Sequence, residues 1–120
     1  MRNNFTGDVD PAAALLAARL GGLSSQTIAG FGNREFDAVS PVFIAQTTAS
    51  QSAVAKPGNF LTRDRKAQSP ATLEAAKQEN KTAYFEFTAG NPHPEVAACI
   101  DRNALRLEAK YVIASPKDEQ

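Results

Sequence analysis

Two segments in the C-terminal half alternate apolar and polar residues, and they constrain the fold more than any other feature. The segments are TAYFEFTAG, residues 82–90, and ALRLEAKYVIA, residues 104–114. A period of two is typical of a half-buried β-strand, so both segments are predicted to be strands. They also carry most of the large apolar side chains, which predicts a core centred on Phe85, Phe87, Leu105, Leu107, Tyr111 and Ile113.

A third strand and three helices are predicted from local signals. The strand begins after Pro41, where β-branched and aromatic residues follow one another at 42–44. The first helix covers residues 11–20, between a capping Asp10 and the helix-ending glycines at 21–22. Ser-Pro at 69–70 predicts a second helix start, and Pro-Glu at 94–95 predicts a short third helix.

Residues 49–68 have no regular period and include a Pro-Gly turn at 57–58. A run of about 20 residues without secondary structure is unusual inside a compact domain, which favours a binding arm or a mobile loop. The length of 120 residues suits one domain, so the chain is predicted to form a single domain over residues 1–120. Its class is α+β: a small sheet of about three strands with short flanking helices, an N-terminal helix and a long irregular central arm at 49–68.

Composition bears on the partners of the chain. The 22 alanines bury little area each, so the core is expected to be small and part of the chain to lie on a partner. The 13 Lys and Arg equal the 13 Asp and Glu, and nucleic-acid-binding domains usually have a basic excess. The charge balance therefore disfavours nucleic acid as a partner. No segment is long and apolar enough to predict a membrane span.

No catalytic motif emerges from the residue types. His93 lies between two prolines and is interpreted as a solvated turn residue, while Cys99 is interpreted as a small buried residue. A Cys–His pair would have no visible third member, and two such residues cannot supply the four ligands of a zinc site. Phosphate-binding glycine loops are absent. The sequence therefore predicts no enzyme, no metal and no cofactor.

One basic cluster is a candidate for partner binding. The segment FLTRDRK, residues 60–66, combines cations with an aromatic residue inside the predicted arm. A solvated loop is the first interpretation of this cluster, an arm that docks on an acidic protein surface is the second, and a nucleic-acid backbone held by the cations is the third. The candidate partner-binding residues are Lys56, Phe60, Arg63, Arg65 and Lys66.

These features favour a non-catalytic structural or assembly subunit of a larger complex or particle, such as a virion, which uses the arm for contacts with other protein subunits in a homo- or hetero-oligomer. A cytoplasmic location, or one within a particle assembled in the cytoplasm, is the matching expectation. A small regulator or inhibitor that binds one protein partner is the alternative.

A DNA-binding protein is a further alternative, because residues 11–33 resemble a degenerate helix-turn-helix. The turn has one glycine more than usual, and Gly30 and Gly32 interrupt the helix that would contact bases. This hypothesis therefore ranks below the other two.

Overall fold

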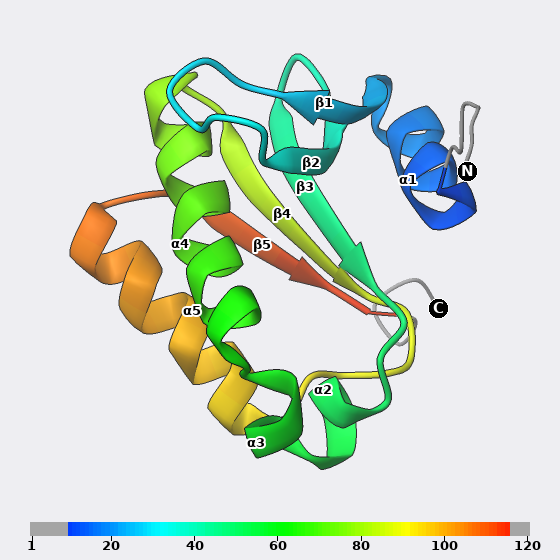
Figure 1. Cartoon of the computed structure of the whole chain (residues 1–120), viewed down its shortest axis with the longest axis vertical. Helices are drawn as coiled ribbons and strands as arrows, with labels where there is room; N and C mark the ends of the chain where they lie inside the picture. Colours follow the sequence, from blue (N-terminus) through cyan, green and yellow to red (C-terminus); the bar gives the residue numbers. More distant parts are fainter. Residues whose placement is uncertain (1–9, 116–120) are drawn as a thin grey trace.

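The computed structural model describes residues 10–115, except for the side chains at 63–65. This part of the chain forms five helices and five strands (Figure 1). In chain order they are α1 (Pro11–Leu20), β1 (Leu23–Thr27), β2 (Glu35–Val39), β3 (Phe43–Thr48), α2 (Ser52–Ala55), α3 (Pro57–Phe60), α4 (Arg63–Gln78), β4 (Thr82–Phe87), α5 (Pro94–Leu107) and β5 (Tyr111–Ala114).

The five strands form one mixed sheet in the order β1-β2-β3-β4-β5. The pairs β1–β2 and β2–β3 are antiparallel, whereas β3–β4 and β4–β5 are parallel. Each parallel connection carries helices, as parallel strands require. Figure 1 shows α4 and α5 side by side across the sheet, with α1 beside β1 and β2.

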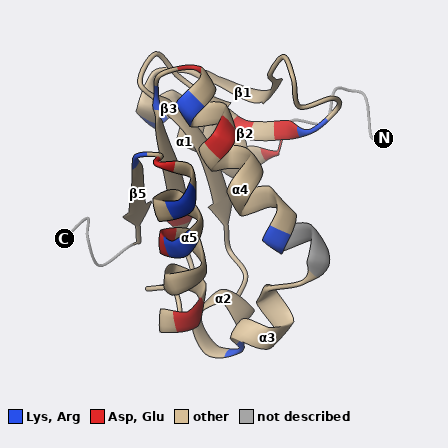
Figure 2. Cartoon of the chain, turned by 90° about the vertical axis from the view of Figure 1, so that its left-hand side faces the viewer, with Lys and Arg blue, Asp and Glu red and all other residues tan. Residues whose placement is uncertain are grey.

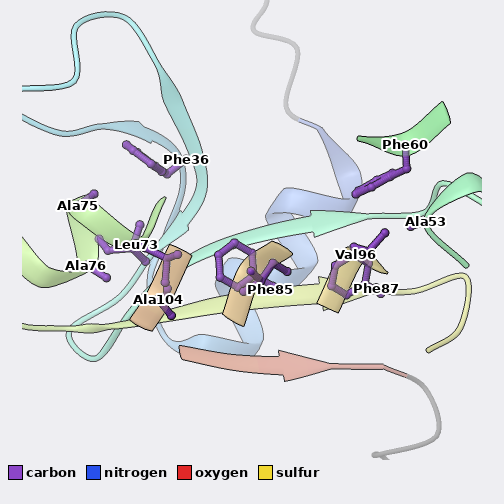
Figure 3. Close-up of a cluster of buried hydrophobic side chains, with 13 residues drawn as sticks. Phe36, Ala53, Phe60, Leu73, Ala75, Ala76, Phe85, Phe87, Val96 and Ala104 are labelled. Carbon is purple, nitrogen blue, oxygen red and sulfur yellow. The ribbon is translucent and has the colours of Figure 1, made fainter. Parts of the chain in front are cut away.

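Apolar side chains form two clusters, and their members alternate along β3 and β4. The smaller cluster joins Leu16 and Ala17 of α1 to Ala38 and Ala45 of the sheet. The larger cluster lies between the sheet and helices α4 and α5 (Figure 3). Its buried members are Phe36, Ile44, Ala53, Phe60, Leu73, Ala75, Ala76, Ala83, Phe85, Phe87, Val96, Ile100 and Ala104.

The α+β class and several local predictions are confirmed. In the first helix, the Asp10 carboxylate accepts a hydrogen bond from the Ala12 amide at 2.9 Å, and Gly21 ends the helix with φ of +74°. The predicted strands after Pro41 and at 82–90 match β3 and β4. Within residues 10–115, no helix is long and apolar enough to cross a membrane.

The predicted sheet of about three strands is wrong, because the sheet has five. Residues 23–27 form β1 and residues 35–39 form β2, and neither strand was predicted. β1 is a polar edge strand held by its pairing with β2, from Leu23↔Val39 to Thr27↔Glu35, so local sequence did not indicate it. A strand at 23–27 also removes the second helix of the supposed helix-turn-helix.

The prediction of an irregular central arm at 49–68 is also wrong. Residues 49–68 contain α2, α3 and the start of α4. α4 begins at Arg63 and continues through Pro70, although a proline within a helix removes one backbone hydrogen bond. Helix packing against the core explains the difference, since Ala53 and Phe60 are buried there.

The last predicted strand is too long, because α5 occupies residues up to Leu107. Val96, Ile100 and Ala104 recur every four residues and form its buried stripe, whereas Leu105 is 78% exposed. Only Tyr111–Ala114 form β5. The Tyr111 hydroxyl donates to Asp101 Oδ1 at 2.9 Å, and this bond, with burial and the Asp101 charge, raises the pKa of Tyr111.

Candidate active site

Strands β2 and β3 part at one point of the sheet. Their last pairs are Ala38↔Ala45 and Val39↔Ile44. One step further, the Asp37 carboxylate accepts a hydrogen bond from the Thr47 backbone amide, with Oδ2 and N 2.8 Å apart. A side chain therefore takes the place of a ladder carbonyl, and it puts a carboxylate between the two strands.

Gln46 follows Ala45, which pairs with Ala38, and precedes Thr47, whose amide holds Asp37. Its side chain is buried, and Nε2 donates to Thr72 Oγ1 of α4 at 3.3 Å. The Thr72 hydroxyl donates its proton to the Gln68 carbonyl oxygen at 2.8 Å, so it can only accept from Gln46. The amide orientation follows from this chain of bonds.

The remaining oxygen of that amide, Gln46 Oε1, is buried and has no hydrogen-bond partner among the described residues. An unpaired buried polar atom costs free energy and is uncommon in native proteins. Gln46 Oε1 therefore lacks the partner that a buried amide oxygen ordinarily has.

A pocket opens beside Gln46, between the sheet and helices α3, α4 and α5. It lies toward the carboxyl ends of the parallel strands β3 and β4, where open α/β sheets usually bind ligands. Figure 1 shows these strands running toward the end of the molecule that carries α2 and α3. The lining residues are Gln46, Thr47, Thr48, Phe60, Leu61, Gln68, Ser69, Phe85, Glu86, Phe87, Val96, Cys99 and Ile100.

A second polar network connects this region to α1. Glu86 of β4 is 4% exposed; its Oε2 accepts from Arg19 Nη2 at 2.5 Å, and its Oε1 accepts from Thr47 Oγ1 at 2.6 Å. The Thr47 backbone amide is the donor that holds Asp37. Arg19, Glu86 and Thr47 therefore join the N-terminal helix to the strand that supports the carboxylate.

Breaking the Arg19–Glu86 pair is expected to destabilise the fold. Arg19→Met leaves a buried carboxylate with one hydroxyl donor. The free energy of unfolding is expected to fall by about 2 kcal/mol, less than for a fully buried pair, because the Arg19 side chain is 45% exposed. Adding Glu86→Gln should recover part of the loss. Urea denaturation of the two single variants and the double variant measures the coupling; strictly additive effects would contradict an energetic pairing.

The structure disperses the predicted partner-binding residues. Phe60 is 9% exposed and packs against Phe87, with ring centroids 6.2 Å apart. Lys56 and Lys66 are exposed, on either side of α3. Arg63 and Arg65 lie at the start of α4, and their side chains are outside the described part of the structure.

His93 and Cys99 have separate surroundings. His93 caps α5, with Nδ1 accepting from the Glu95 amide at 3.1 Å. Cys99 lines the pocket and accepts a weak bond from Asn103, with Sγ and Nδ2 3.8 Å apart. The sequence analysis missed Asp37, Gln46 and Glu86, although each is a polar side chain within an apolar strand segment.

The described residues thus form an α+β domain with a mixed sheet, a carboxylate between two parting strands, and beside a pocket a buried amide oxygen that none of them pairs. The chain belongs to the family described as restriction endonuclease fold toxin 3, whose model matches residues 3–110. Comparison with curated proteins gives no match, and comparison with solved structures gives none either.

Family membership corrects the functional expectations. The prediction of a non-catalytic structural subunit or virion component is wrong, because the family is one of restriction endonuclease fold toxins. The prediction that the chain is not an enzyme is overturned by the same finding, and a nuclease fold also conflicts with excluding nucleic acid as a partner. Net charge misled here: in Figure 2, acidic and basic residues are interspersed along α5, so an overall balance says little about one site.

Proposed function

We propose that the protein is a nuclease toxin that hydrolyses phosphodiester bonds of nucleic acid. The observation that carries the proposal is the Asp37 carboxylate held by the Thr47 amide where β2 and β3 part, next in the chain to Gln46, whose Oε1 is buried and has no hydrogen-bond partner among the described residues. Family membership supports it independently. The word toxin in the family description supports a role in damaging the nucleic acid of a cell.

The donor chemistry of the Asp37 and Gln46 side chains is of the kind that a divalent cation takes. Mg²⁺ takes oxygen ligands and is usually held by one or two carboxylates together with substrate phosphates. Asp37 supplies a carboxylate, and Gln46 Oε1 supplies a carbonyl oxygen whose lone pairs no described residue uses. No group of three or more His, Cys, Asp or Glu side chains suited to a metal lies within the described residues, so phosphate and water would complete the shell. A bound cation would stabilise negative charge on the phosphate and lower the pKa of a bound water.

The residues around the pair have positioning roles in this proposal. The Thr47 amide fixes the Asp37 carboxylate, and Thr72 fixes the Gln46 amide with its oxygen unpaired. Both ligand atoms are thus oriented before substrate binds, which avoids reorganisation during the reaction. Lys66, exposed near the start of the helix that supplies Gln68 and Ser69, provides a positive charge for a phosphate backbone.

The proposal predicts cation-dependent cleavage. Purified protein is incubated with labelled single-stranded and duplex DNA and RNA, in Mg²⁺ or in excess EDTA. Shortened products are expected in Mg²⁺ and should fall to the level of the buffer blank in EDTA. Intact substrates of all four kinds in Mg²⁺ and in Mn²⁺ would contradict the proposal.

A further inference from the structure

We propose that the pocket beside Gln46 binds one unpaired nucleobase of the substrate. The inference rests on the proposed nuclease function and adds the substrate class: a strand whose bases are accessible. It concerns the apolar part of the pocket, away from the cation position between β2 and β3.

The walls of the pocket suit a flat apolar group. Phe60, Phe85, Phe87, Val96 and Ile100 line it, and Figure 3 shows Phe60, Phe87 and Val96 gathered at one end of the core cluster, with Phe85 next to them. Aromatic side chains favour nucleobases regardless of base type, since every base has an apolar face.

The size of the pocket limits the occupant. The space open to the centre of a water molecule is about 60 Å³. At roughly 15 Å³ for each water, this corresponds to about four water molecules. A cluster of waters against mostly apolar walls is readily displaced by a flat apolar ring. A single ring is therefore the expected occupant, which favours pyrimidines over purines.

The pocket also has a polar group that could recognise the edge of a base. Ser69 lines the same pocket, and its hydroxyl oxygen is buried without a hydrogen-bond partner among residues that the structure describes. Serine within a helix usually satisfies its hydroxyl on a carbonyl of the preceding turn. Once the Ser69 side chain turns toward the pocket, its hydroxyl can both donate to and accept from the polar edge of a base.

The pocket lies beside the residues proposed to act in cleavage. Gln46 and Thr47 line the pocket, and the Thr47 amide holds Asp37, so a nucleotide whose base occupies the pocket would have its phosphate on the side of these residues. A base within a duplex has to be unstacked and unpaired before it enters such a pocket, at a cost of a few kcal/mol. Single strands are therefore the favoured substrates.

Binding of short labelled strands tests the pocket without relying on catalysis. Fluorescence anisotropy, with Ca²⁺ in place of Mg²⁺, compares oligothymidylate with a strand of equal length made of abasic nucleotides, and oligouridylate serves as the RNA arm. The strands that carry bases are expected to bind at least about tenfold more tightly than the abasic strand. Oligoadenylate should bind less tightly than oligothymidylate.

Ser69→Ala separates recognition from simple packing. Removal of this buried hydroxyl should leave the free energy of unfolding unchanged or raise it. The affinity for oligothymidylate should nevertheless fall about tenfold, toward the affinity for the abasic strand. Cys99→Met, which fills the pocket, should have the same effect on binding, whereas Cys99→Ala leaves the space open and serves as its control. Stability from urea denaturation accompanies each variant.

The outcomes distinguish the pocket from the proposed function. Equal affinity for strands with and without bases, or no change in Ser69→Ala and Cys99→Met, overturns the pocket proposal and shows that water alone occupies it. Cleavage in Mg²⁺ with equal affinity would leave the nuclease proposal intact. Base-dependent binding without cleavage would support the pocket and overturn the nuclease proposal.

Discussion

Asp37→Asn is expected to lower the rate of nucleic-acid cleavage by about 100-fold or more, the usual effect of removing a group that stabilises charge in the transition state. Asparagine keeps an oxygen that can accept from the Thr47 amide, so the parting of β2 and β3 is preserved. The negative charge is lost, and with it the carboxylate that the Thr47 amide holds at the point where the strands part. Single-turnover cleavage of the best substrate in Mg²⁺ measures the effect.

Glu35→Gln is the matched control for this variant. Glu35 lies on the same strand, two residues before Asp37, and its side chain is exposed. Glu35→Gln removes one negative charge, as Asp37→Asn does, without changing the proposed site. The cleavage rate of Glu35→Gln should therefore stay within about twofold of the wild type. Equal losses in the two variants would show that net charge matters and the pair does not. Full activity of Asp37→Asn would remove Asp37 from the mechanism.

Local sequence predicted those elements whose signals lie within the element itself. α1 has its cap, its proline and its terminal glycine in adjacent positions, and β4 alternates clearly because one face is buried. β1 has no such pattern and exists through its pairing with β2. Leu105 and Leu107 fitted a period of two, but the four-residue stripe that begins at Val96 decided the structure. Tertiary packing selects between patterns that coexist in one segment.

The candidate site was hidden for a different reason. Asp37 and Gln46 are nine positions apart in sequence, and only the pairing of β2 with β3 brings Asp37 to Thr47, the neighbour of Gln46. Neither belongs to a Cys or His motif of the kind that sequence analysis finds readily. The Thr72 contact that orients Gln46 comes from a helix 26 positions further along the chain. A search limited to Cys, His and glycine-loop motifs therefore found no site where oxygen donors make one.

Gly22→Ala is expected to destabilise the protein by about 3 kcal/mol or more, because forced overlap in a packed region is costly. A Cβ at this position would lie 2.2 Å from the Val39 carbonyl oxygen and 2.7 Å from Ser40 Cα, both backbone atoms. Backbone atoms cannot move aside as the end of a flexible side chain can. The glycine therefore sets how closely the end of α1 approaches β2.

Gly58→Ala provides the comparison, since nothing lies within 4 Å of a Cβ at this position of α3. Alanine suits a helix better than glycine, so stability should stay the same or rise by up to about 1 kcal/mol. Urea denaturation of both variants gives the two free energies of unfolding. Because α1 also carries Arg19, a displaced helix in Gly22→Ala should weaken the Arg19–Glu86 coupling in the double-mutant cycle as well. Equal stability of the two alanine variants would show that α1 does not rest on the Val39–Ser40 backbone as closely as described.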